Sequence, residues 1–68
     1  MKIRLTKKIF YKESTKWLLN GGCVYAYISP RIISQVVRKL EKLTKLKLIY
    51  YLYSKEEEDY FVIRKKDN

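Results

Sequence analysis

The chain has no histidine and only one cysteine, Cys23, among its 68 residues. One cysteine cannot form a disulfide within the chain, and a structural zinc site needs about four cysteine or histidine ligands. We therefore expect no metal site, no cofactor and no disulfide framework. Because Cys23 follows two glycines and begins an apolar run, its thiol is interpreted as a small buried hydrophobic group.

The lack of histidine also removes most catalytic arrangements. A hydrolase would have to use a serine–lysine pair or two carboxylates, and the only carboxylate cluster, residues 56–59, falls in a predicted turn and not in a cleft. The two glycines, Gly21 and Gly22, lack the rest of a phosphate-binding loop. The sequence predicts neither enzymatic activity nor a small-molecule substrate.

Long hydrophobic runs are missing as well. The longest apolar run, residues 48–53, is far shorter than the roughly 20 residues of a membrane-spanning helix. The N-terminal residues alternate between apolar and polar side chains, without the apolar segment of a signal peptide. We expect a cytoplasmic protein that has no contact with a membrane.

Acidic residues are scarce and unevenly placed. The chain has 16 lysines and arginines against 7 acidic residues, a formal net charge of +9. Four of these acids are residues 56–59, so the rest of the chain is still more basic. A domain with this charge attracts polyanions. We expect a nucleic acid as partner, with DNA first and RNA as a second candidate, and hence a nucleoid-associated location.

The chain is long enough for one small domain, residues 1–68. A domain of this size buries only roughly 60% of the surface that its unfolded chain exposes, so it is marginally stable alone. Since no disulfide or metal is expected to stabilise it, we predict a homodimer.

Hydrophobic periodicity divides the chain into six segments. Alternation and β-branched or aromatic content predict strands over residues 2–6, 23–28, 46–53 and 60–63. Helical spacing predicts helices over residues 9–20 and 30–44. The order β-α-β-α-β-β predicts an α/β (α+β) two-layer sandwich, with both helices on one face of a four-stranded sheet. Right-handed β-α-β crossovers would set the strands side by side, and the last two strands would form a hairpin.

The second helix has the most informative sequence. Ser29 is predicted to cap it and Pro30 to occupy its first position. Apolar side chains then recur at helical spacing and are expected to form part of the core: Ile33, Val36, Val37, Leu40 and Leu43. Basic side chains stay off that stripe, among them Arg31, Arg38, Lys39 and Lys42. A strand therefore leads directly into a basic amphipathic helix.

Several short motifs resemble the Alba family of small archaeal chromatin proteins. Thr6-Lys7-Lys8 is similar to the family's Gly-Lys-Lys after its first strand, and residues 31–37, Arg-Ile-Ile-Ser-Gln-Val-Val, to its Arg-Ala-Ile-Ser-Lys-Ala-Val. Residues 18–21 resemble the end of the family's first helix, and residues 63–66 its last strand. The resemblance covers most of residues 3–66. It implies an Alba-like fold and a chromatin role, with Lys7 and Lys8 in contact with DNA.

The chain departs from this family in the connection between its last two strands. In the family that hairpin is a long, flexible, basic arm that reaches along the minor groove. Here it is short and acidic, residues 54–59, and would repel phosphate. Ser29 and Pro30 also stand where the family tends to have arginine and glycine.

The residues predicted to contact nucleic acid are basic side chains near helix starts and on the last strand. Lys7 and Lys8 would lie at a helix N-terminus, where backbone N–H groups also favour phosphate. Arg31 is expected to bind a phosphate with both arms of its guanidinium. The full predicted set is Lys7, Lys8, Lys12, Arg31, Arg38, Lys39, Arg64 and Lys65.

Aromatic residues are plentiful, with seven tyrosines. Most are expected to pack in the core or at a subunit interface, and base stacking on an exposed sheet is the alternative. Trp17 is expected in the core.

Three functions fit these observations. The first is an Alba-like dimer that binds DNA or RNA without sequence preference, by neutralising backbone phosphates. The second is a winged-helix transcription regulator, with helix 30–44 as its recognition helix and the last hairpin as its wing. The predicted strand before that helix and the acidic hairpin argue against the second. The third is a protein-interaction subunit whose charge only maintains solubility.

Overall fold

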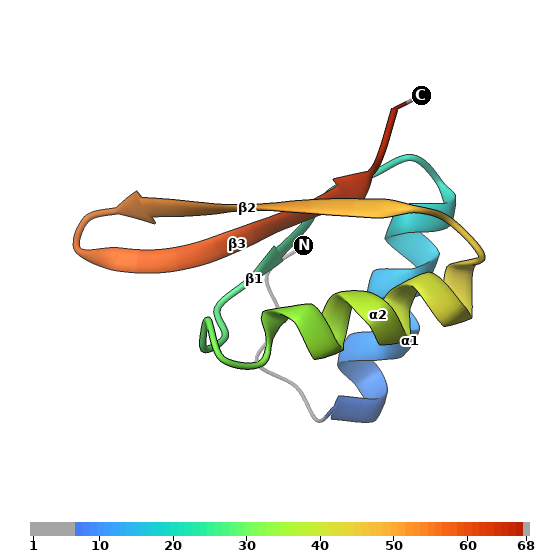
Figure 1. Cartoon of the computed structure of the whole chain (residues 1–68), viewed down its shortest axis with the longest axis horizontal. Coiled ribbons are helices and arrows are strands. Elements are labelled where there is room, and N and C mark those ends of the chain that lie inside the picture. The colour runs from blue at the N-terminus through green and yellow to red at the C-terminus, as the bar shows by residue number, and fades with distance from the viewer. Residues whose placement is uncertain (1–6, 68) are drawn as a thin grey trace.

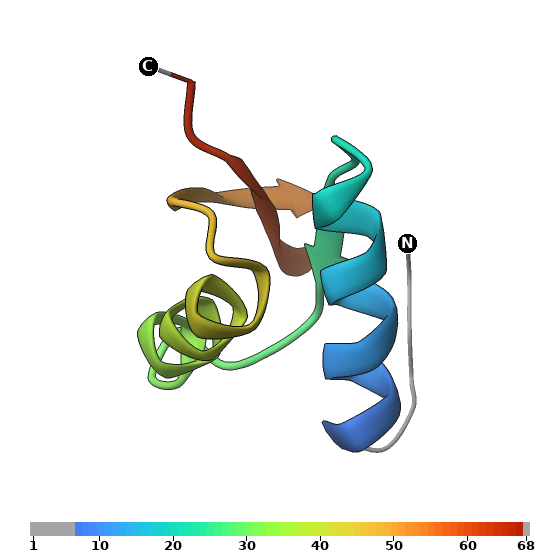
Figure 2. The ribbon, with the colours of Figure 1, turned by 90° about the vertical axis from the view of Figure 1, so that its right-hand side faces the viewer.

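The computed structural model describes residues 7–67 and contains two helices and three strands. In chain order the elements are α1 (Lys7–Leu19), β1 (Val24–Ala26), α2 (Ile33–Thr44), β2 (Leu48–Lys55) and β3 (Glu58–Lys65). Both helices lie on the same side of the sheet (Figure 1). They cross steeply, since the view along α2 shows α1 running across it (Figure 2). The architecture is an α+β fold in two layers.

The sheet differs from the predicted one. Its strand order is β1-β3-β2 and both pairings are antiparallel. The predicted β-α-β-α-β-β sandwich with a four-stranded sheet is therefore wrong for the described residues, which hold three strands; the strand predicted over residues 2–6 lies outside them. The predicted hairpin is confirmed, because β2 and β3 pair over their whole length. The tight turn places β3 beside β2, which leaves the other edge of β3 for the short β1.

α1 begins two residues earlier than predicted and ends in a glycine motif. Gly21 has a φ of 80°, in the left-handed region that glycine adopts without strain. Its N–H donates to the carbonyl of Leu18 at 3.1 Å, and the N–H of Gly22 donates to that of Trp17 at 2.8 Å. These two bonds form a Schellman motif, which satisfies the last carbonyls of the helix. Trp17 is 47% exposed, so its predicted place in the core is wrong.

The core lies between the two helices and the inner face of the sheet. Leu40 from α2 and Ile63 from β3 are fully buried at its centre. The other buried apolar side chains are Leu18, Val24, Ala26, Ile33, Val36, Val37, Leu48 and Phe61. The predicted apolar stripe of the second helix is thus confirmed except at Leu43, which is 49% exposed.

α2 starts three residues later than predicted. Residues 30–32 form a separate turn, closed by a 3.0 Å bond from the N–H of Ile32 to the carbonyl of Ser29. The Ser29 hydroxyl does accept a backbone hydrogen bond, from Arg31 at 3.2 Å, but it does so within this turn. Ile32 is the N-cap residue, and its side chain makes no capping bond.

The connection from α2 to β2 is fixed by two side chains of the helix. Thr44 Oγ1 donates to the Leu40 carbonyl at 2.7 Å and accepts from the N–H of Leu46 at 3.2 Å. Glu41 Oε2 accepts from the N–H of Leu48 at 3.0 Å. Lys45, the C-cap residue of α2, has a φ of 62°. This left-handed conformation reverses the chain directly after the helix. These contacts fix the direction in which β2 leaves α2.

The outer face of the sheet carries no helix of the described chain (Figure 2). Tyr51 and Tyr53 of β2 lie on that face and are about half exposed. Within residues 7–67 nothing covers this face of β2. None of the helices in residues 7–67 is long and apolar enough to cross a membrane.

Candidate nucleic-acid interface

The exposed side of α2 carries mainly polar and basic side chains, with Leu43 as its exposed apolar residue. Burial of Ile33, Val36, Val37, Leu40 and Thr44 turns the opposite face to solvent. That face, which we call the α2 polar face, consists of Ser34, Gln35, Arg38, Lys39 and Lys42. These positions recur every three or four residues, so their side chains form one continuous stripe along the helix.

No carboxylate lies in the middle of the α2 polar face. Glu41 is the only acidic residue of α2, and it is half-buried where it accepts the hydrogen bond from Leu48. Its charge is therefore directed toward the start of β2. The stripe presents serine and glutamine as neutral hydrogen-bonding groups, flanked by guanidinium and ammonium groups.

The N-terminal end of α2 is open to an anion. Its first turn has no acidic residue and its N-cap side chain makes no hydrogen bond. The first intrahelical bond starts at the N–H of Val36, which donates to the Ile32 carbonyl at 3.0 Å. The partial positive charge of the first helical turn is therefore not neutralised by the helix itself. Arg31 is exposed directly before it.

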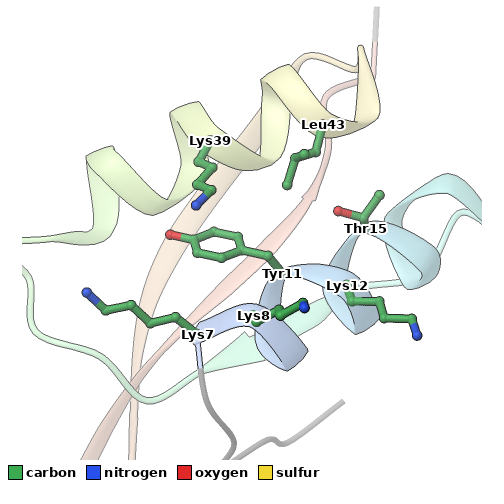
Figure 3. Close-up of a pocket in the computed structure, with 7 residues that line it drawn as sticks. All are labelled: Lys7, Lys8, Tyr11, Lys12, Thr15, Lys39 and Leu43. Carbon is green, nitrogen blue, oxygen red and sulfur yellow. The ribbon is translucent and has the colours of Figure 1, made fainter.

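A second basic feature is a cavity of about 520 Å³ between α1 and α2 (Figure 3). Its lining, which we call the lysine cavity, is Lys7, Lys8, Tyr11, Lys12, Thr15, Lys39 and Leu43. Four lysines from two helices thus line one space together with an aromatic ring and a leucine, and Figure 3 shows Lys7 and Lys12 extending away from each other. None of the lining residues is acidic.

The lysine cavity contains one cation–π contact and borders one buried hydroxyl group. The Nζ atom of Lys39 lies 4.3 Å from the centre of the Tyr11 ring, a cation–π distance that holds the ammonium group over the ring face. The Thr15 hydroxyl oxygen is buried without a hydrogen-bond partner among the described residues, and Figure 3 shows it on the side of Tyr11.

The structure separates the predicted site residues into three groups. Lys7, Lys8, Lys12 and Lys39 meet at the lysine cavity, while Arg38 lies on the α2 polar face and Arg31 before it. Arg31 is not among the residues that line the cavity, where Lys39 and Leu43 are the residues from α2.

Arg64 and Lys65 form the third group, apart from the α2 polar face. The Arg64 guanidinium lies over the ring of Tyr51, 5.7 Å from its centre, on the sheet face opposite the helices. A hydrogen bond with Tyr51, and then one with Asp67, raises the pKa of Arg64 above its usual value, although desolvation lowers it. Arg64 also forms an ion pair with Asp67 at 3.3 Å. Arg64 thus belongs to the outer face of the sheet and not to the α2 polar face.

Ser34 and Gln35 are functional candidates that the sequence prediction omits. The available signal was their spacing: each lies four residues before a basic side chain of the helix, Arg38 or Lys39, and off the apolar stripe. Uncharged polar residues were not considered because the sequence argument rested on net charge. The structure places both on the exposed side of α2.

The tip of the β2–β3 hairpin, residues 56–59, is acidic. Glu56 and Glu57 form a two-residue turn with positive φ values of 53° and 65°. The tip is ordered by a hydrogen bond between the Ser54 hydroxyl and the Asp59 carboxylate. In Figure 1 it extends past the N-terminal end of α2. Within residues 7–67 no group of three or more acidic or cysteine side chains is arranged to hold a metal ion.

No known protein family, curated protein or solved structure matches this chain. The function must therefore be argued from the arrangement of its own side chains.

Proposed function

We propose that the protein binds duplex DNA by laying the α2 polar face in a major groove, with the lysine cavity on a flanking phosphate. The observation that carries the proposal is the row Ser34, Gln35 and Arg38 on the exposed side of one helix. Arginine pairs with guanine, glutamine with adenine, and serine with either, through the base edges of the major groove. The location that follows is the nucleoid.

The position of this row on the helix supports the proposal. Recognition helices contact base edges with their N-terminal residues, and Ser34 and Gln35 lie in the first turn of α2. The open N-terminus and Arg31 lie where a backbone phosphate would pass. A helix followed by a two-stranded hairpin is also the arrangement expected of a winged helix, although residues 30–32 form a turn where that fold has a further helix.

Duplex DNA is a better fit than duplex RNA. The major groove of B-DNA is about 12 Å wide and admits an α-helix. The major groove of A-form RNA is deep and narrow, so side chains cannot read it. A mode that uses a helix face therefore favours DNA, whereas neutralisation of phosphates alone would not distinguish the two duplexes.

The decisive experiment selects binding sites from a random duplex DNA library at about 150 mM salt. The proposal expects an enriched motif that contains a guanine read by Arg38. Arg38→Lys keeps the positive charge but loses the two-armed contact, so it should relax the preference at that guanine while most of the phosphate attraction stays. The loss expected for one such contact is about 1–3 kcal/mol.

Variants of the lysine cavity should behave differently from Arg38→Lys. Lys8→Ala should weaken all DNA sequences alike and reduce the salt slope by about one. Lys16→Ala is the matched control, because this exposed lysine lies on α1 outside the lysine cavity. Binding without any enriched motif, equal on DNA and RNA, would contradict base reading by α2 and favour binding by charge alone. Absence of binding at low salt would contradict both.

A further inference from the structure

The outer face of the sheet carries five tyrosines that contact one another. β-sheet register places Tyr25 and Tyr51 on either side of Val62, so these three side chains share one face. Neighbouring positions such as Val24 and Ile63 point the other way, into the core. We call this surface the tyrosine face; its tyrosines are Tyr25, Tyr27, Tyr51, Tyr53 and Tyr60.

Tyr60 is the centre of the tyrosine face. Its ring centre lies 6.0 Å from that of Tyr25 and 5.5 Å from that of Tyr27. The ring of Tyr53 stacks on it at 5.9 Å, and Tyr51 contacts Tyr53 at 6.4 Å. These contacts hold the rings in fixed positions, so the surface loses little conformational entropy on binding a partner.

The tyrosine face is large enough to form much of an interface. Tyr25, Tyr27, Tyr51 and Tyr53 are each 41–49% exposed. At roughly 200 Å² per tyrosine, they leave about 350 Å² uncovered. A standard interface buries about 800 Å² on each partner, so these rings alone would supply close to half of it. The half-buried Ile49 and Val62 adjoin them on the same face.

Charge is distributed unequally along the two long strands beneath this face. One end is the acidic hairpin tip, with Glu56, Glu57, Glu58 and Asp59. The other end is basic, with Lys45, Lys47, Arg64, Lys65 and Lys66. β-strand pairing runs from Leu48 with Lys65 to Lys55 with Glu58, so the two groups are separated by the full length of the hairpin, about 24 Å.

We propose that the tyrosine face binds the tyrosine face of a second copy of this chain, with the strands of the two copies antiparallel. The two-fold axis would lie in the plane between the two sheets, perpendicular to the strands, and pass over β3 at the level of Phe61. Glu58 and Arg64 are both on the outer face, three residues to either side of Phe61. Arg64 of each copy then faces Glu58 of the other, and each basic end faces an acidic tip.

This surface is complementary to itself, as a two-fold interface requires. Parallel strands would instead place acidic tip on acidic tip and basic end on basic end. Charge therefore selects one of the two orientations, while the tyrosines supply the contact area. Both helices remain outside the interface, because they cover the other face of the sheet (Figure 2).

A nucleic acid fits the tyrosine face less well than a second copy does. Stacking platforms for single strands combine aromatic side chains with a positively charged groove. On the tyrosine face the charged side chains are Lys55, Glu58 and Arg64, next to the acidic tip. The lysine cavity and the α2 polar face lie on the helix side of the sheet.

The first test is sedimentation equilibrium over a range of protein concentrations, with Tyr53→Lys. This substitution removes an exposed ring from the tyrosine face, and we expect the dimer dissociation constant to rise at least tenfold. Leu52→Lys is the matched control, because Leu52 directly precedes Tyr53 in the same strand, is 54% exposed and lies on the opposite face. It should leave the dissociation constant within about twofold. Circular dichroism would verify that both variants are folded.

The second test addresses the orientation. Arg64→Glu and Glu58→Arg should each weaken the dimer, since each places like charges opposite each other. The double variant restores opposite charges and should recover most of the lost affinity. A double variant as weak as the single ones would overturn the antiparallel arrangement.

Three results would overturn the proposal as a whole. The first is a wild-type chain that stays monomeric at about 0.5 mM. The second is an equal change of the dimer dissociation constant in Tyr53→Lys and Leu52→Lys. The third is a monomer that binds an oligothymidine strand and loses this binding in Tyr53→Lys. The last would assign the tyrosine face to nucleic acid. None of these results depends on the selection experiment with α2, so this proposal and the proposed function fail separately.

Discussion

Glu41 Oε2 accepts a hydrogen bond from the backbone N–H of Leu48 at 3.0 Å, and so joins the last turn of α2 to the first residue of β2. This bond has two effects. It satisfies a donor at the start of a strand whose first residue is buried, and it holds the only carboxylate of α2 away from the α2 polar face. The same contact therefore serves both the fold and the charge of the candidate interface.

Glu41→Ala should destabilise the protein by about 1.5 kcal/mol, because the Leu48 N–H loses a charged acceptor. Glu41→Gln keeps an acceptor oxygen and should recover more than half of that loss. Urea unfolding followed by circular dichroism measures both free energies. Lys42→Ala is the control, since this neighbouring side chain is exposed and makes no such bond. A loss in Glu41→Ala no larger than in Lys42→Ala would contradict the role of this bond.

Leu40 and Leu43 make a second matched pair on α2. Leu40 is fully buried, whereas Leu43 is 49% exposed. Leu40→Ala should therefore cost about 2–5 kcal/mol of unfolding free energy, and Leu43→Ala less than about 1 kcal/mol. Leu43 also lines the lysine cavity, so its removal tests whether the floor of the cavity matters for DNA affinity in a protein that is still folded. Equal losses of stability would show that the helix packs differently.

At the end of α1, Gly21 and Gly22 are each required to be glycine, but for different reasons. A Cβ atom on Gly22 would lie 2.8 Å from Cε3 of Trp17 and 3.1 Å from its carbonyl oxygen. At Gly21 nothing lies within 4 Å, but φ is 80°. We expect Gly21→Ala to cost about 1 kcal/mol from backbone conformation alone. Gly22→Ala should act through the indole ring.

A double-mutant cycle separates the two contacts at Gly22. Trp17→Ala removes the ring but not the carbonyl oxygen, so Gly22→Ala should cost less in the Trp17→Ala background than in the wild type. Thermal unfolding of the four proteins gives the coupling energy. A coupling of zero would indicate that only the backbone contact opposes the Cβ atom. Trp17 itself is exposed, and its removal alone should lower stability only modestly.

Local sequence features predicted the elements well but not their partners. Alternation in β1 and the two strands of the hairpin identified three strands, and the glycines at 21 and 22 marked the end of α1. Which strand pairs with which depends on contacts between residues far apart in sequence. β1 aligns its Val24 with Ile63, nearly 40 positions later, and no local pattern specifies that choice.

For the tyrosines the sequence left two places open, the core and a subunit interface, for a related reason. Tyrosines at positions 51 and 53 have the composition of a covered strand, but nothing in the described chain covers them. A sequence shows that a surface is apolar without showing whether its own chain or another copy will bury it. Trp17 was assigned to the core because helical spacing puts it on one face with Phe10 and Leu18, but it is 47% exposed.

The sequence prediction contains the charged residues of the proposed site and omits its neutral hydrogen-bonding residues. Lys7, Lys8, Lys12 and Lys39 were all identified as basic candidates, and they line one cavity. Ser34 and Gln35 were omitted, since their role follows from the side of α2 that is exposed. That side is known only once the packing of the helix against β3 and α1 is known.

The hairpin turn offers a prediction that links stability to DNA binding. Glu56 and Glu57 both have positive φ, a conformation for which asparagine or aspartate followed by glycine is preferred. Glu56→Asp with Glu57→Gly, and Glu56→Asn with Glu57→Gly, should each stabilise the protein by about 1 kcal/mol in urea unfolding. The two double variants have nearly the same turn preference but differ by one negative charge.

This difference makes the pair a probe of how near DNA approaches the acidic tip. The tip extends past the N-terminal end of α2 (Figure 1), where the proposed groove contact begins. The asparagine variant should bind duplex DNA more tightly than the aspartate variant, about twofold to fivefold at low salt, because one carboxylate fewer repels the phosphates. The ratio should approach one at about 0.5 M salt, since screening removes the repulsion. Equal affinities at low salt would mean that the hairpin lies beyond reach of the DNA and that α2 and the lysine cavity bind it alone.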